Sequence, residues 1–349
     1  MKSIAKKSIP WLGTAAIFAY LGLTTDLDRF FASIAHTNPW AFVGVVVIGV
    51  LVGYLSDCFC LKILFHRFFG PVGFRDVMEV KGTSYFLNVV NYNAGAGGVA
   101  LFMSKRFGFN FMEAIGAMIF LNAMDLFALS ILLCFGMAFG SGLLAPEQQE
   151  PLILLLVGMG VLFVGTILFW VYKVPFLPSY IRTLRIFHGF RVAKLSDYAA
   201  LLGARTPFVA HYVVLHWAFM PLFGLDIPFS HLLVYVPILI FITVLPISIA
   251  GLGTTQVAMR YFLAPYPPLS ACAPLIGGLF LVASASGADP TGSASIVGEY
   301  ISTQGTNPAA QIDAYSTSSI LGLLAARIGL GLFTVRSVSR DFTEEKPAT

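Results

Sequence analysis

The sequence predicts an all-α polytopic membrane protein, a single integral domain over residues 1–349 with about six transmembrane helices and two re-entrant hairpins. Hydrophobic residues make up 57% of the chain and charged residues only 11%, whereas soluble domains carry about 25% charged residues. Several charge-free runs exceed the 18 residues that indicate a membrane span. Two further apolar runs are interrupted by glycine, proline or asparagine, which breaks a helix inside the membrane.

The first two spans are expected at about Ile9–Thr25 and Trp40–Phe65. The basic flank of Ile9–Thr25 resembles a signal peptide, but no small-residue cleavage site follows it, so a retained span is favoured. Lysines before this span place the amino terminus in the cytoplasm by the positive-inside rule. The acidic loop Asp26–Pro39 is then expected outside.

The segment of about 83–103 carries three asparagines followed by three glycines, and basic residues flank it on both sides. Both flanks therefore favour the cytoplasm, which a single crossing cannot satisfy. We expect a re-entrant hairpin that enters from the cytoplasmic side. The asparagines and glycines in question are Asn88, Asn91, Asn93, Gly95, Gly97 and Gly98.

Three spans follow the first hairpin. They are expected at Phe111–Gly140, Leu152–Tyr172 and Ala199–Phe223. The loop Lys173–Lys194 is the most basic in the chain and is therefore expected in the cytoplasm.

A second interrupted segment covers about 231–265, where Pro246 and a Ser/Gly/Thr-rich turn break an apolar run. A plain turn between two ordinary spans is the alternative interpretation. No Lys or Arg occurs after Arg260 until Arg327, so both flanks favour the outside and predict re-entry from the opposite face. Two oppositely oriented hairpins are typical of an inverted-repeat transport fold with a site near the midplane.

The last span is expected at about Tyr315–Val335 and returns the carboxy terminus to the cytoplasm. The polar segment 287–313 is expected to form an outside loop. Ala271–Ser286 is apolar but short, and is expected to be a half-helix or an interfacial segment. The predicted localisation is the plasma (inner) membrane, with both termini cytoplasmic.

Charged residues inside the spans are the first candidates for function. Asp125 is a buried carboxylate that needs a partner, and Arg205, Arg260 and Arg327 are candidate partners. An arginine can also hold a lipid phosphate through its planar fork. A structural ion pair is the alternative for each. Asp57 is expected to form a local pair with Lys62 at the end of its span.

Other classes of protein are not supported. The sequence has no nucleotide-binding loop, no Ser-His-Asp order and no paired catalytic carboxylates. His211 and His216 lack further ligands at a metal-site spacing, and the cysteines are expected to be buried thiols. We therefore expect no metal and no cofactor. A nucleic-acid partner is not expected either, because the net charge of +4 reflects the cytoplasmic loops.

Several motifs carry a resemblance to a known family. Leu245–Gly253, with a Pro-Ile-Ser and Gly-x-Gly pattern, resembles the signature of the lysylphosphatidylglycerol synthase transmembrane (flippase-like) family. Gly95–Gly98, Phe102–Gly108 and Met124–Leu126 are similar to the glycine-rich hairpin, basic turn and acidic span of its first half. Arg327 resembles a basic residue of its closing span. The chain resembles the stand-alone membrane module without the synthetase domain.

This resemblance implies two re-entrant hairpins and a role in moving polar or isoprenoid lipids. The chain departs from the family pattern at Thr255 and Gln256, where an Arg-Glu pair is common, and at Asn122, where an arginine is common. Fewer fixed charges leave the head-group and any proton coupling open.

The favoured function is flippase-like transport of a polar or anionic lipid across the membrane, without an enzymatic role. A membrane-embedded transferase or an accessory subunit acting on a lipid-linked substrate is the alternative. The expected partners are membrane lipids, with a second copy of the chain or a lipid-synthesis protein left open. The candidate head-group site comprises Asn88, Asn91, Asn93, Gly95, Gly97, Gly98, Asp125, Ser248, Gly251, Gly253, Thr254, Thr255, Gln256, Arg260 and Arg327. The polar hairpin residues could equally cap broken helix ends.

Overall fold

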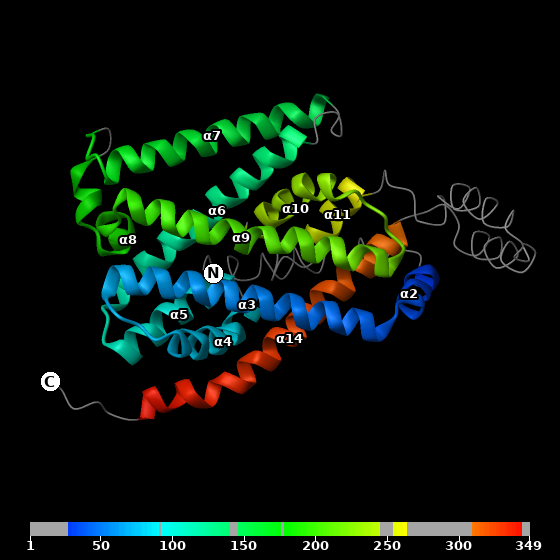
Figure 1. Ribbon diagram of the computed structural model, residues 1–349, viewed down its shortest axis with the longest axis horizontal. Coiled ribbons are helices and arrows are strands. Elements are labelled where there is room, and N and C mark those ends of the chain that lie inside the picture. Colours follow the sequence, from blue (N-terminus) through cyan, green and yellow to red (C-terminus); the bar gives the residue numbers. More distant parts are fainter. Residues whose placement is uncertain are drawn as a thin grey trace, which may run out of the picture.

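The protein is described by a computed structural model that covers residues 27–90, 92–139, 146–175, 178–244, 254–263 and 309–343. These residues form helices joined by short turns, and no β-strand occurs among them. The predicted all-α class is therefore confirmed (Figure 1).

Five helices are long and apolar enough to cross a membrane. They correspond to five of the six predicted spans, and Ile9–Thr25 lies outside the described residues. The chain is thus a multi-pass membrane protein. The five spans lie in α3 (Pro39–Phe69), α6 (Phe111–Phe139), α7 (Pro146–Trp170), α9 (Leu195–Phe219, continued by the 3-10 helix η3, Met220–Phe223) and α14 (Ala309–Thr343).

Shorter helices complete the described part of the chain. The first group connects the spans and consists of α2 and the short helices between α7 and α9. The second group lies within the two predicted hairpins. The connecting helices are α2 (Leu27–His36), η1 (Ser179–Thr183), η2 (Arg185–Phe187) and α8 (His188–Val192).

The first predicted hairpin is a pair of helices, α4 (Phe74–Val90) and α5 (Tyr92–Phe107), which pack against each other. It begins at Phe74, earlier than expected, because the chain breaks before α4 at Gly70, whose φ of 114° is accessible mainly to glycine. The 17 residues of α4 span roughly 26 Å, less than the roughly 30 Å hydrocarbon core. This length suits a re-entrant arm, and re-entry stays a prediction.

The second predicted hairpin contains α10 (Phe229–Val244) and α11 (Thr254–Leu263), which also contact each other. The predicted turn between them, with Ser248, Gly251 and Gly253, lies outside the described residues.

Two long helices contact both of these helix pairs. α6 packs against α5 and α10, whereas α14 packs against α4 and α11. Each pair therefore places one arm on α6 and the other on α14. An inverted repeat would produce this arrangement, although the repeat itself stays a prediction.

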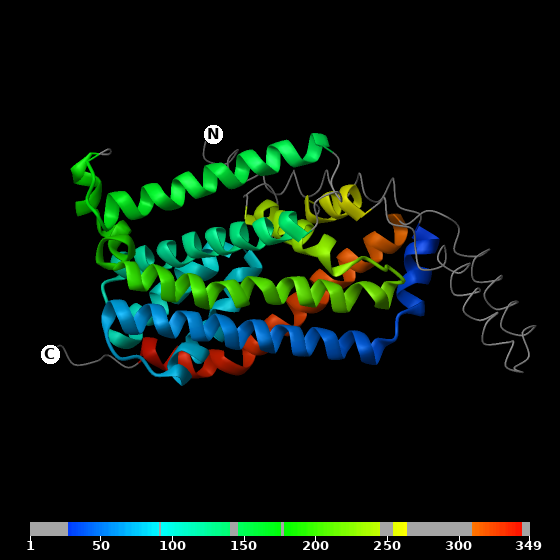
Figure 2. The ribbon, with the colours of Figure 1, turned by 45° about the horizontal axis from the view of Figure 1, so that its top comes forward.

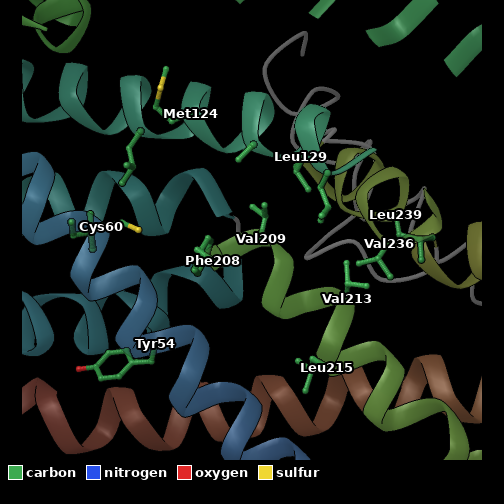
Figure 3. Close-up of a cluster of buried hydrophobic side chains, with 14 of the residues drawn as sticks. Tyr54, Cys60, Met124, Leu129, Phe208, Val209, Val213, Leu215, Val236 and Leu239 are labelled. Carbon is green, nitrogen blue, oxygen red and sulfur yellow. The ribbon is translucent and has the colours of Figure 1, made fainter. Parts of the chain in front are cut away.

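The buried core runs along α3, α6, α9 and α10 and includes side chains from α4, α5, α11 and α14. Figure 3 shows Val213 of α9 beside Val236 and Leu239 of α10, within one continuous cluster of buried apolar side chains. Small residues allow close approach: Gly136 of α6 lies directly against the backbone of Leu233 in α10.

By contrast, α7 lies at the edge of the molecule (Figures 1 and 2). Only 6% of the most apolar window in Gln149–Trp170 is buried, and its mean hydropathy of 2.8 is the highest of the five spans. In a membrane its exposed apolar side chains face lipid.

The last helix starts earlier than predicted. α14 begins at Ala309, inside the segment 287–313 that was expected to form a loop, and Asp313 is buried in it. The remainder of that segment and Ala271–Ser286 lie outside the described residues.

Candidate functional site

Four charged side chains from four helices form one buried charge network, defined here as Asp57 (α3), Lys81 (α4), Asp125 (α6) and Arg205 (α9). Arg205 donates to Asp57 Oδ1 at 2.6 Å and to Asp125 Oδ2 at 2.5 Å. The Lys81 ammonium lies 2.5 Å from Asp57 Oδ2. Two carboxylates balance two cations, so the network carries no net charge and needs no ligand for neutrality.

Asp57 and Lys81 lie in surroundings that differ from those predicted. Asp57 was expected to pair locally with Lys62, but its partners come from α4 and α9. Lys81 was assigned to a cytoplasmic flank, whereas it is 8% exposed within the first helix pair. Arg205 is 2% exposed and is the largest fully buried side chain among the described residues. Asp125 does pair with one of its three expected partners.

A small polar cavity adjoins the network. It is lined by Asp57, Lys81 and Arg205 together with Asn122 of α6 and Ala96 of α5. Asn122 occupies the position where related proteins were expected to carry an arginine. The cavity is therefore enclosed by residues of α3, α4, α5, α6 and α9.

A second ion pair links α11 to α14. Arg260 donates through Nε to Asp313 Oδ1 at 2.6 Å and through Nη2 to Asp313 Oδ2. The two oxygens receive two parallel donors, which is the strong bidentate form of this interaction. Thr255 and Gln256 are buried nearby in sequence on α11. The charge of Arg260 is therefore already balanced within the protein.

Arg327 of α14 differs from the other two membrane-embedded arginines. It lies 5.8 Å from the ring centre of Tyr85 on α4 and donates only a long 3.5 Å hydrogen bond to the Tyr212 hydroxyl of α9. In the part of the chain that the structure describes, no carboxylate forms an ion pair with Arg327. It is partly buried, about eight residues or roughly 12 Å from the end of the span Gln311–Val335.

The hairpin candidates are only partly placed. Gly95 and Gly98 are buried in α5, and Gly98 packs against Leu87 of α4. The backbones of Asn88, Asn93 and Thr254 belong to helices, but their side chains are outside the description, as is all of Asn91. The expected meeting of both hairpin tips around one lipid site stays a prediction.

Four residues of these sites were not among the candidates predicted from the sequence: Lys81, Tyr85, Tyr212 and Asp313. A signal was available for two of them. Lys81 and Tyr85 are four residues apart, the spacing that places them on one helix face, and the ammonium lies 5.4 Å from the ring centre. Tyr212 and Asp313 gain their roles only from helix packing, so nothing local in the sequence identifies them.

The comparisons with known proteins agree with the fold. The sequence model of the family described as "Lysylphosphatidylglycerol synthase TM region" matches residues 11–282, which is more than half of the chain. No curated protein matches the chain. The matched region contains both predicted hairpins, the charge network and Arg260, and it ends before α14. The chain belongs to the lysylphosphatidylglycerol synthase transmembrane-region family.

Proposed function

We propose that the protein moves an anionic, phosphate-bearing lipid across the membrane, and that Arg327 contacts the lipid phosphate. The membership of a lipid-related membrane family supports a role at lipids. The observation that carries the proposal is the contrast among three arginines. Arg205 and Arg260 are balanced by carboxylates, whereas no described carboxylate pairs with Arg327.

An unbalanced charge inside a membrane span is costly, and such residues usually serve a substrate path. Arg327 has five N–H donors, of which one makes a long bond to Tyr212. A phosphate would supply both the missing negative charge and acceptors for the planar fork. Tyr85 and Tyr212 keep the guanidinium between α4, α9 and α14, next to the first helix pair.

The test is transport in reconstituted vesicles. Purified protein would be placed in phosphatidylcholine vesicles with a fluorescent phosphatidylglycerol, whose outer-leaflet fraction is bleached by dithionite. Arg327→Gln should slow transport about tenfold or more, because a charge-assisted hydrogen bond contributes about 1.5–3 kcal/mol. Arg327→Lys should be intermediate, because lysine keeps the charge but loses the fork.

Arg75→Gln is the matched control, since Arg75 is exposed and its pair with Glu79 lies at the surface. Each variant must retain the melting temperature and elution volume of the wild type. Rapid phosphatidylglycerol transport by folded Arg327→Gln would refute the role of Arg327. Absence of transport by folded wild-type protein would refute the proposed function itself.

A further inference from the structure

A cavity of about 430 Å³ lies between α6, α7 and α9, away from the charged sites. We define it as the α6–α7 groove, lined among others by Ile131, Cys134 and Phe135 of α6 and by Leu156, Met159 and Gly160 of α7. Its volume falls within the roughly 300–1,000 Å³ typical of small-molecule sites.

The depth of the groove in the span shows that it is surrounded by the hydrocarbon core of the bilayer. Met159 and Gly160 stand at the middle of the span Gln149–Trp170, roughly 15 Å from either end. This depth lies inside the roughly 30 Å hydrocarbon core of a bilayer. The molecules available at this depth to fill a groove beside a lipid-facing helix are lipid chains.

The apolar lining of the groove favours the acyl chain of a lipid over its head-group. The Ser130 hydroxyl already donates to the Leu126 carbonyl at 2.8 Å, and Cys134 contributes a free thiol. The remaining lining side chains are apolar. A head-group would lose its hydration here without gaining partners, whereas an acyl chain loses nothing.

The side chains that form the walls of the groove leave its interior open. Phe127 of α6 and Phe163 of α7 meet edge to face at 4.7 Å between ring centres and form one wall. Phe135 is 52% exposed at the groove. A Cβ atom added at Gly160 would meet nothing within 4 Å, so there is open space at this glycine in the middle of the groove.

We propose that the α6–α7 groove binds one acyl chain of a membrane phospholipid. The proposal does not depend on Arg327 or on transport, because the groove is separate from the charge network and from α14. Its chemical requirement is a hydrocarbon chain that reaches the middle of the bilayer.

The proposal can be tested by photolabelling in vesicles of phosphatidylglycerol and phosphatidylethanolamine. A phospholipid with a diazirine at the middle of one acyl chain is irradiated, and the labelled residues are mapped by peptide mass spectrometry. We expect Cys134, Leu156 and Met159 to be labelled severalfold more than exposed α7 residues such as Leu154 and Val161. Equal labelling of both sets would overturn the proposal.

Filling the groove supplies a matched comparison. Gly160→Phe should reduce the labelling of Cys134 severalfold, whereas Gly158→Phe should not, since Gly158 has equally open surroundings but does not line the groove. Ala138→Phe, from the α6 wall, provides a second filling variant if Gly160→Phe fails to fold. Undiminished labelling in a folded filling variant would overturn the proposal. Labelling that persists in Arg327→Gln would separate this site from the proposed transport function.

Discussion

Arg205 of α9 donates to Asp57 of α3 at 2.6 Å across 148 positions of sequence, with both side chains buried. The same guanidinium holds Asp125 of α6, and Lys81 of α4 completes the charge balance. One arginine thereby links two spans to its own helix, and through Asp57 also to the first helix pair. The network is a structural connection at the centre of the fold, and a contact between Asp125 and a lipid head-group stays a prediction.

Replacing Arg205 should therefore destabilise the whole protein. Arg205→Gln keeps a polar side chain but leaves Asp125 and part of Asp57 without a cation. Breaking a buried pair by removing one partner costs about 3–5 kcal/mol. We expect poor yield or a strongly lowered melting temperature in detergent, measured by intrinsic fluorescence.

Arg75→Gln is the control for this substitution. Arg75 is 92% exposed at the side chain and pairs with Glu79 within one helix. Exposed pairs contribute about 0–1 kcal/mol, so its melting temperature should barely change. An equal drop in melting temperature in the two variants would show that the buried network stabilises the protein no more than an exposed ion pair does.

The spans could be predicted from sequence because long charge-free runs leave few alternatives in a membrane. The charge network could not, because sequence presents charged residues one at a time. Lys81 and Asp313 each appeared to belong to a polar flank, and the positive-inside rule assumes that a lysine lies in water. In the structure, carboxylates or cations from distant helices balance these charges, so both residues are buried within helices.

The same reason explains the boundaries that shifted. α4 and α14 each begin before the predicted segment, in sequence that contains charged residues. There Lys81 pairs with Asp57, and Asp313 pairs with Arg260. The sequence places Arg327 within a span, as it does Arg205 and Arg260, but only the partners of all three in the structure distinguish Arg327 from the other two. Asp125 could be identified from sequence as needing a partner, while the identity of that partner depended on the packing of α6 against α9.

Gly136 should tolerate no larger residue. A Cβ atom there would lie 2.5 Å from the Leu233 carbonyl oxygen, and this backbone atom cannot move aside as a flexible side chain can. We expect Gly136→Ala to destabilise the protein by about 1–3 kcal/mol, the usual cost of overpacking. Gly158→Ala, whose Cβ meets nothing within 4 Å, should be neutral or stabilising by about 0.5–1 kcal/mol. Thermal melts in one detergent would compare them, and similar melting temperatures would contradict the close α6–α10 packing.

Protonation of His188 should lower the stability of the folded protein at low pH. Burial lowers the pKa of His188 below its usual range, Arg191 lowers it further, and Glu113 opposes both. The folded protein then binds fewer protons at this residue than the unfolded chain does. This contribution is complete above about pH 6.5, the unfolded value, and is lost as the pH falls. We expect the drop in melting temperature from pH 7.5 to 5.5 to be smaller in His188→Gln.

His66→Gln is the control for that measurement, because His66 is exposed at the end of α3. Its drop in melting temperature between the two pH values should match that of the wild type. If His188→Gln also matched the wild type, protonation of His188 would have no part in acid destabilisation.

Substitution of the ion pair formed by Arg260 and Asp313 would distinguish between two roles for Arg260. The sequence predicts a contact with the lipid phosphate, whereas the structure shows a bidentate bond that joins α11 to α14. Arg260→Gln and Asp313→Asn should each lower stability, because each leaves one charge unbalanced in a partly or fully buried place. The double variant should lose less than the sum of the two, with a coupling of about 0.5–3 kcal/mol in a double-mutant cycle. If Arg260 only joins the helices, the double variant should also recover transport of phosphatidylglycerol. Recovered stability without recovered transport would instead show that the charge of Arg260 or of Asp313 acts in transport beyond joining the two helices.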